Sequence, residues 1–241
     1  MSAEANFSSP PASRRRIIVA IDGPAGAGKS TIARHLARHF GLLNLETGAM
    51  YRAFALKALR TGAPLDSSSA LEALLQETSI RLESGEDENR VLLDEEDVTG
   101  QLRNPTVTDA ASRVSAIPAI RAWMVRLQQE LGAKGGIVME GRDIGTVVFP
   151  HAEVKIFLDA APEVRGLRRF DQLGPARAQQ PEEVIRELRE RDTRDRNRAD
   201  SPLRPAADAV LLDSTYMTLD EAVTAAEAIV TEKLENAAAI S

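Results

Sequence analysis

Short apolar runs alternate along this chain with longer amphipathic stretches, the order typical of β-strands followed by α-helices. Repeated strand–helix units of this kind predict an α/β fold with a parallel sheet and right-handed crossovers. Strands are predicted from mainly apolar runs at residues 17–22, 137–139, 154–158 and 209–212, with a short extended piece at 42–45. Residues 137–139 and 154–158 are expected to be buried core strands. Helices are predicted at residues 29–40, 47–60, 105–115, 118–131 and 218–234, with two more starting near Pro162 and at Pro181.

One segment breaks this alternation. Residues 79–83 and 90–93 flank Gly85 and an acidic turn, which predicts an antiparallel hairpin. Leucines at helical spacing after three serines predict a short helix just before it. We interpret residues 65–103 as an inserted subdomain within one domain spanning 16–241, and residues 1–15 as a disordered tail.

Composition narrows the class of protein. The 241 residues are 43% hydrophobic and 27% charged, which is ordinary for a globular protein and enough for one domain with a modest insertion. No apolar run approaches the roughly 18 residues of a membrane span, and the first residues lack the apolar core of a signal peptide. The chain has no cysteine, which excludes disulfides, thiolate metal sites and cysteine nucleophiles. We expect a cytoplasmic monomer that does not bind membranes.

Charge is distributed unevenly around a net value of −6. Residues 72–97 hold ten acids and two arginines, whereas residues 164–198 hold ten arginines and seven acids. Arginine makes up 25 of the 30 basic residues, and its planar fork of donors suits phosphate groups. Because the chain as a whole is not basic, we expect small phosphorylated ligands rather than a nucleic acid.

A phosphate-binding loop follows the first predicted strand. The pattern G-x-x-x-x-G-K-[ST] occupies the turn between this strand and the first helix, the context that a P-loop requires. Its backbone N–H groups would cradle the phosphates of a nucleoside triphosphate, Lys29 would reach the β- and γ-phosphates, and the Ser30 hydroxyl would ligate Mg²⁺. The residues are Gly23, Pro24, Ala25, Gly26, Ala27, Gly28, Lys29, Ser30 and Thr31.

Polar clusters follow two other predicted strands, and in a parallel sheet these strand ends lie on the ligand-binding edge. Tyr51 and Arg52 lie one turn into the helix after residue 45, and Arg142 and Asp143 follow the strand that ends at Met139. A surface ion pair in a turn is the alternative interpretation of Arg142 and Asp143.

An arginine-rich run begins at residue 189. Arg191, Arg194 and Arg198 share one helical face, and Asp195 lies at its edge. Such a helix next to a P-loop could supply the cations that phosphoryl transfer requires. The alternative is a solvated helix held by ion pairs between successive turns.

The three histidines are His35, His39 and His151. His35 and His39 form an i,i+4 pair on the first helix, but a metal site there lacks a third ligand in the sequence. We therefore interpret all three as surface or packing residues.

The chain resembles the bacterial cytidylate kinases, the CMP/dCMP kinase branch of the P-loop nucleoside monophosphate kinases. The matching segments appear in the family's order from about residue 17 to the C-terminus, and the Gly-Arg-Asp word with the arginine run is their most specific part. They are residues 21–31, 47–52, 140–150, 154–160, 190–192, 194–198, 206–209 and 212–215. Thr47 stands where the family often has Ser and keeps the hydroxyl. Glu140 stands where the family often has Asp, which leaves the contacts of the Gly-Arg-Asp word intact.

The resemblance implies a P-loop NTPase fold and phosphorylation of CMP and dCMP by ATP. It assigns residues 23–31 to ATP, and a poorly matching lid to about residues 168–180. The CMP phosphate would be held by Thr47, Tyr51, Arg52, Arg142 and Arg198. Asp143, Ser112 and Arg121 would read the cytosine, and Arg191 and Asp195 would contact the ribose. Lys29, Arg168, Arg194 and Arg198 would stabilise charge during transfer.

The chemistry of the residues agrees with these roles. A phosphate acceptor is already mostly ionised at neutral pH, so no general base is required. Asp143 can accept a hydrogen bond from the exocyclic amine of cytosine, whereas uracil would present a carbonyl oxygen to it.

Three alternatives stay open on the residues. A P-loop kinase of UMP or of a shikimate-like hydroxyl acceptor is one, and a hydroxyl acceptor would need Asp22 or Asp143 as a base. A switch GTPase is disfavoured, because the chain has no Asn-Lys-x-Asp word. A non-catalytic nucleotide-binding adaptor could use the acidic hairpin as its partner surface.

Overall fold

The computed structural model describes residues 17–83, 89–173 and 180–240. The predicted tail, the tip of the hairpin at Gly85 and residues 174–179 of the predicted lid lie outside these residues. No helix in the described ranges is long and apolar enough to cross a membrane.

Five parallel strands form the main sheet, in the order β2-β6-β1-β7-β8. Their bounds are β1 Ile18–Asp22, β2 Leu43–Glu46, β6 Ile137–Gly141, β7 Val154–Asp159 and β8 Val210–Asp213. β1 is the central strand, and its last residue, Asp22, lies opposite Gly141 of β6 and Phe157 of β7. The carboxyl ends of these three strands therefore meet at one edge, as the alternating pattern predicts.

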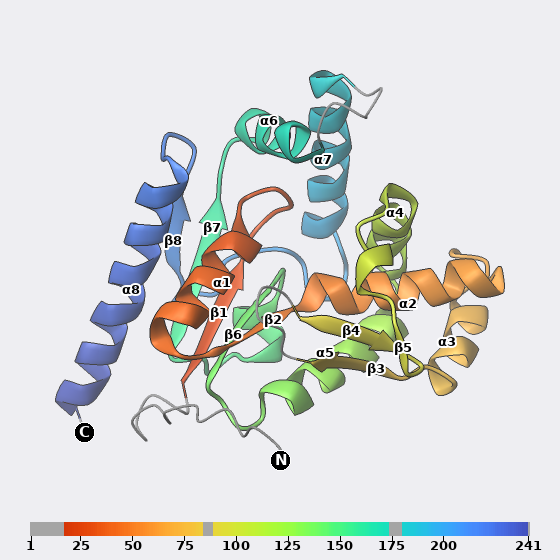
Figure 1. Cartoon of the computed structure of the whole chain (residues 1–241), viewed down its shortest axis with the longest axis horizontal. Helices are drawn as coiled ribbons and strands as arrows, with labels where there is room; N and C mark the ends of the chain where they lie inside the picture. Colours follow the sequence, from red (N-terminus) through yellow and green to blue (C-terminus); the bar gives the residue numbers. More distant parts are fainter. Residues whose placement is uncertain (1–16, 84–88, 174–179, 241) are drawn as a thin grey trace, which may run out of the picture.

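Helices surround the sheet in the predicted order. They are α1 Lys29–Phe40, α2 Thr47–Thr61, α3 Ser68–Gln76, α4 Pro105–Val114, α5 Pro118–Gly132, α6 Pro162–Leu173, α7 Pro181–Arg196 and α8 Leu219–Ile240. Proline at the first turn begins α4, α5 and α7, where its missing N–H costs no hydrogen bond. Figure 1 shows α6 and α7 beyond the carboxyl ends of β1 and β7.

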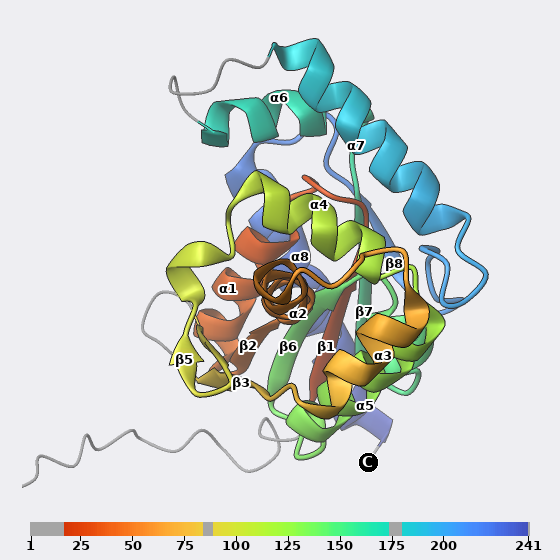
Figure 2. The ribbon, with the colours of Figure 1, turned by 90° about the vertical axis from the view of Figure 1, so that its right-hand side faces the viewer.

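The two faces of the sheet bury different helices. Val19 and Ile21 of β1 belong to a cluster with residues of α1 and α8, whereas Ala20 between them faces a second cluster with Met139 and Ile144. This alternation follows from the two-residue period of a strand. Figures 1 and 2 show α1 and α8 together on one side of the sheet and α5 on the other. A short π-helical turn, η3 Ile144–Val148, packs against α5.

A second, antiparallel sheet confirms the predicted hairpin and extends it. It comprises β3 Ile80–Glu83, β4 Arg90–Leu93 and β5 Glu96–Asp97, with a 3₁₀ turn, η2 Thr99–Gln101, directly after it. The sequence did not predict β5, because its two exposed acidic residues carry no apolar signal.

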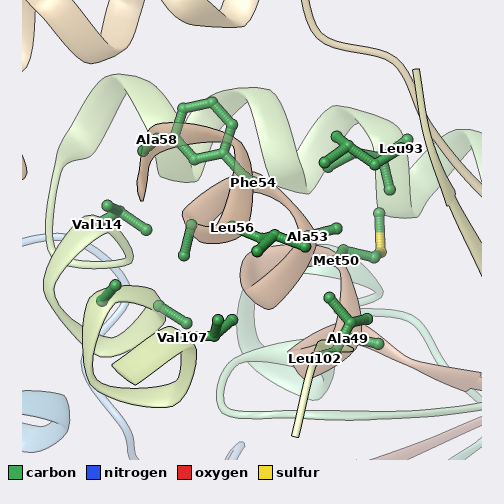
Figure 3. Close-up of a cluster of buried hydrophobic side chains, with 14 of the residues drawn as sticks. Ala49, Met50, Ala53, Phe54, Leu56, Ala58, Leu93, Leu102, Val107 and Val114 are labelled. Atoms are coloured by element: carbon green, nitrogen blue, oxygen red, sulfur yellow. The ribbon is translucent and has the colours of Figure 1, made fainter. Parts of the chain in front are cut away.

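This small sheet packs on α2, α2 packs on α4, and together they form a core of their own. Phe54 and Met50 of α2 lie between Leu93 of β4 and Val107 and Val114 of α4, as Figure 3 shows. The cluster takes in buried residues from Ala49 to Met124 and is therefore wider than the range 65–103. This core holds the first turn of α2 in place at the edge of the main sheet.

Candidate active site

The P-loop occupies the turn between β1 and α1, at the carboxyl edge of the sheet. Gly23, Gly26 and Gly28 all have positive φ angles, and Gly28 is the left-handed cap from which α1 begins. A Cβ on Gly23 would lie 1.9 Å from the carbonyl oxygen of Leu158 in β7, so only glycine allows the loop to pass so close to that strand. The loop therefore has the conformation that the glycine pattern predicts.

Lys29 is buried at the first position of α1, and its Nζ donates a hydrogen bond to the Pro24 carbonyl at 2.7 Å. Burial and, next, the positive charge of Arg142 lower the pKa of Lys29, which comes to about 7. Glu140 and Asp22 oppose the shift only in part. The amine therefore lies in a positive environment that an anion would relieve.

We expect nucleotide binding to take up a proton at Lys29. At pH 8 an amine with a pKa of about 7 is mostly neutral, and a triphosphate next to it raises the pKa, so binding is accompanied by protonation and weakens as the pH rises. Calorimetry of ATP binding at pH 8, in buffers of different ionisation enthalpy, measures the proton. Lys29→Met is the control that removes this uptake; equal uptake in the variant would contradict the assignment.

Ser30 and Glu140 pair at the next position of the loop. The Ser30 hydroxyl donates to Oε1 of Glu140, the buried residue near the end of β6, next to β1. Burial raises the pKa of Glu140, and the nearby Glu46 raises it further. The two oxygens are the hard donors that Mg²⁺ prefers. Sequence reasoning used Glu140 only as part of a motif and did not assign it to Mg²⁺. The signal that could have found it is an acidic residue near the end of a buried strand.

Asp22 joins the end of β1 to the turn after β6. Its two carboxylate oxygens accept the backbone N–H groups of Ile144 at 2.8 Å and Gly145 at 2.7 Å. Burial raises its pKa to about 6 in spite of these hydrogen bonds. Because both oxygens are occupied, Asp22 is placed to position the turn that carries Asp143 rather than to act as a free base.

Asp143 is buried against an arginine from α5. Oδ2 of Asp143 lies 2.8 Å from Nη2 of Arg121, whose Nη1 donates to the Ser115 carbonyl at 3.1 Å. The Arg121 guanidinium also lies 5.8 Å from the centre of the Tyr51 ring. Burial raises the pKa of Tyr51 to about 12, so its phenol stays protonated and available as a donor. The arrangement excludes the alternative of a surface ion pair for Asp143.

Asp195 of α7 lies between two more arginines, Arg142 and Arg198. Its Oδ2 accepts from Nε of Arg142 at 3.0 Å, and its Oδ1 lies 3.6 Å from Nη2 of Arg198. Burial alone would raise the pKa of Asp195, but the guanidiniums of Arg142, Arg191 and Arg198 outweigh burial and hold it below its usual range. Part of the arginine run that begins at residue 189 therefore faces the buried Asp195 instead of the solvent.

The positive charges in this cluster repel one another. Burial and the neighbouring charges of Arg142, Arg52 and Arg194 together lower the pKa of Arg191 to about 10. Burial and Arg121 lower the pKa of Arg198 as well. Cations held together at this cost are a common feature of sites that bind anions.

The start of α2 completes this side of the site. The hydroxyl of Thr47 donates to the Glu140 carbonyl at 2.8 Å, and Arg52 pairs with Glu46. The two strand ends β2 and β6 and the α2 N-terminus are thereby tied together beside the P-loop.

The sequence profile of the cytidylate kinase family matches residues 19–232 of this chain. A cytidylate kinase of Pelotomaculum thermopropionicum is 50% identical over 208 residues, which cover 85% of this chain and 92% of that protein. The chain belongs to the cytidylate kinase family. A cytidylate kinase of Solibacter usitatus, 46% identical over 226 residues, covers 92% of this chain and spans 96% of its own length. The resemblance stated from the motifs is confirmed, and the protein is a nucleoside monophosphate kinase.

A solved shikimate kinase from Acinetobacter baumannii, in complex with shikimate, aligns over 93% of this chain and 97% of its own at 18% identity. The TM-score of this alignment is 0.43, so it has no bearing on which family the chain belongs to.

Three residues that the resemblance assigns to this kinase's site do not contact the arginines on Asp195 in the contacts described. They are Ser112, Arg194 and Arg168. Ser112 is buried in α4 with a hydroxyl that has no hydrogen-bond partner among the described residues. Arg194 is exposed, and its Nη1 lies 3.7 Å from Oδ1 of Asp109 in α4. Arg168 donates to the Ser214 hydroxyl and to the carbonyls of Ser214 and Met217, in the segment between β8 and α8. The structure does not bring Arg168 to the P-loop.

A different arginine of α6 does contact the P-loop. Arg165 is 1% exposed; it donates to the Ala25 carbonyl at 2.9 Å, to the Ala160 carbonyl at 2.7 Å and to Oδ2 of Asp192 at 2.6 Å. It therefore ties the P-loop to the end of β7 and to α7. Sequence reasoning missed Arg165, because nothing in its local pattern separates it from the other arginines of α6.

Proposed function

We propose that this kinase transfers the terminal phosphoryl group of ATP to the phosphate of CMP or dCMP, giving ADP and CDP or dCDP. The observation that carries the proposal is the position of Lys29, whose pKa is lowered by Arg142, a member of the arginine cluster on Asp195. Lys29 on the P-loop and the arginine cluster on Asp195 thus bring positive charge to the carboxyl edge of one sheet, as a reaction between two phosphate anions requires.

ATP would bind with its phosphates on the backbone N–H groups of the P-loop. Lys29 would leave the Pro24 carbonyl and pair with the β- and γ-phosphates. Ser30 and Glu140 fit Mg²⁺ by their oxygen donors, and the ion when bound neutralises charge on the transferring group.

The acceptor phosphate would bind between the first turn of α2 and the arginines on Asp195. Arg142 and Arg198 supply charge there, and Tyr51 supplies a protonated phenol. Thr47 and Arg52 lie at the same strand ends. One oxygen of the acceptor attacks the γ-phosphorus, and the bond from that phosphorus to the bridging oxygen of ADP breaks. Because the acceptor oxygen is already ionised, no proton has to be removed.

The cytosine would be recognised by Asp143, Arg121 and Ser112, and the ribose by Arg191 and Asp195. The buried hydroxyl of Ser112, which has no partner among the described residues, and the buried Asp143–Arg121 pair support a polar base pocket. A hydroxyl acceptor is less well supported, because Asp22 is occupied by two N–H groups and Asp143 by Arg121.

Several assignments stay predictions. Charge stabilisation by Arg168 and Arg194 would require both guanidiniums to leave the partners described above. We also infer action as a monomer without nucleic acid, because all the residues invoked belong to one chain; sedimentation with and without substrates tests this. The cytoplasmic location is likewise a prediction.

The direct test is ADP formation with each acceptor offered in turn. We expect turnover with CMP and dCMP, and much less with UMP, AMP or shikimate. Turnover with shikimate alone would assign a hydroxyl acceptor, and no turnover with any acceptor would favour a nucleotide-binding adaptor.

Asp143→Asn should weaken the preference for CMP over UMP by roughly ten- to hundredfold in kcat/KM. Uracil opposes a carboxylate with a carbonyl oxygen, and such a mispaired buried group costs about 1–3 kcal/mol; an amide can donate to that oxygen instead. The ratio of the two kcat/KM values measures the effect, with the exposed Asp200→Asn as control. An unchanged ratio would remove Asp143 from base recognition.

Arg198→Ala should lower kcat at least about tenfold, because it removes one cation from the acceptor phosphate. The matched control is Arg204→Ala, an exposed arginine six residues further along. Steady-state rates with CMP and a thermal melt of both variants check the prediction. Full activity would show that Arg198 has only a structural role, as a partner of Asp195.

A further inference from the structure

The exposed surface between α1 and α8 carries a second group of potential ligands. His35 and His39 lie one turn apart on α1, and Glu227 of α8 reaches both of them. The i,i+4 pair has no third ligand nearby in the sequence, and folding supplies one from 192 residues further along the chain. Figure 1 shows α1 and α8 side by side on this face of the sheet.

The donor atoms converge on one point. Oε1 of Glu227 lies 2.5 Å from Nε2 of His35 and 2.9 Å from Nδ1 of His39. The two rings are stacked, with centroids 6.2 Å apart and an interplanar angle of 26°. All three ligand atoms lie within 4.8 Å of one another. A tetrahedral ion with bonds of about 2.0–2.2 Å needs donors roughly 3.4 Å apart, so a small rotation that moves the Glu227 oxygen about 1 Å or less away from the two imidazoles makes room for it.

These side chains have room for that rotation. The His35 and His39 side chains are 45% and 52% exposed and Glu227 is 25% exposed, so they can move without disturbing the core. Their exposure also leaves positions open for water ligands on a bound ion. In the metal-free chain the Glu227 carboxylate oxygen lies close to both imidazoles and is hydrogen-bonded to Nε2 of His35.

We propose that His35, His39 and Glu227 form a binding site for one divalent transition-metal ion of the Zn²⁺, Co²⁺ or Ni²⁺ class. Two neutral imidazoles and a carboxylate suit these ions, whereas Mg²⁺ prefers oxygen ligands alone. The chain has no cysteine, and its remaining histidine, His151, lies outside this group. The imidazole pair is therefore the strongest such donor set in the sequence.

The site is distinct from the catalytic centre and would link two elements of the fold. His35 lies six residues beyond Lys29, about 9 Å along the helix axis from the start of α1. An ion held by α1 and α8 would fasten the P-loop helix to the last helix of the chain. Because the ligands come together only in the folded state, binding would raise the melting temperature.

Titration of the untagged, nucleotide-free protein with Zn²⁺, Co²⁺ and Ni²⁺ by calorimetry tests the proposal. We expect one ion per chain, a visible Co²⁺ absorption spectrum, and a higher melting temperature with Zn²⁺. His39→Asn and Glu227→Gln should each weaken binding at least about tenfold, while His151→Asn, the matched control, should leave it unchanged. Melts without metal check that each variant is folded.

Two results would overturn the proposal. One is the absence of saturable binding up to about 1 mM metal, and the other is equal affinity in the parent chain and in both ligand variants. Loss of binding in His151→Asn instead would assign the ion to a different place. None of these readouts depends on kinase activity, so they are independent of the proposed reaction.

Discussion

Lys29→Met is expected to lower kcat for CMP phosphorylation by about 10²–10³-fold while the protein stays folded. The variant loses the cation that would follow the negative charge on the transferring phosphoryl group, and removal of one such group costs about this much in other enzymes. Stability should not fall, because the amine is buried and its pKa is lowered to about 7, so the folded state disfavours its charge.

The measurement is ADP formation at saturating ATP and CMP, with thermal melts of both proteins. Lys134→Met, at an exposed position in the turn before β6, is the matched control and should keep full activity. A variant with unchanged kcat and a higher KM would show that Lys29 contributes only to ground-state binding.

Arg165→Met is expected to lower the free energy of unfolding by about 3–5 kcal/mol, because it leaves Asp192 as an uncompensated buried charge. It also leaves the carbonyls of Ala25 and Ala160 without the donors that they have here. Since the lost contacts hold α6 and α7 against the P-loop, ATP binding should weaken as well.

Urea denaturation followed by circular dichroism measures the loss, and hydrogen exchange in α7 shows where the structure opens. Arg168→Met is the matched control one turn further along α6; it donates only to neutral groups, so we expect a cost of about 1 kcal/mol per hydrogen bond or less. Adding Asp192→Leu to Arg165→Met should recover part of the loss. No recovery in the double variant would show that packing, not the buried charge, dominates.

The order and type of the main elements could be predicted from local pattern. α1 was predicted with its observed bounds because glycines stand at both of its ends, Gly28 before Lys29 and Gly41 after Phe40. β6 and β7 extend further than their apolar runs, because Glu140 and Asp159 continue the strand through backbone pairing that a hydrophobic pattern does not record. β5 was not predicted for the same reason, because its two acidic residues join the sheet through backbone pairing alone.

The active site also has parts that motifs predicted and parts that only the structure showed. The motifs located the P-loop, the turn at Arg142 and Asp143, and the arginine helix, since each is a short word with a characteristic spacing. They did not show that Asp195 pairs with Arg142 across 53 residues, or that Arg165 rather than Arg168 contacts the P-loop. Ten arginines between residues 164 and 198 look alike in a sequence, because their local patterns carry no record of what packs against them.

The sequence by itself determined the family, the phosphate-binding loop and the succession of strands and helices, because these depend on contacts between residues close together in the chain. Only the tertiary structure decided which charges are buried and with which partners. Ser30 meets Glu140 across 110 residues and His35 meets Glu227 across 192, and such pairs exist only after the sheet has brought their elements together. A buried charge is stabilised by its partner and not by its neighbours in sequence, so its role is set by the fold.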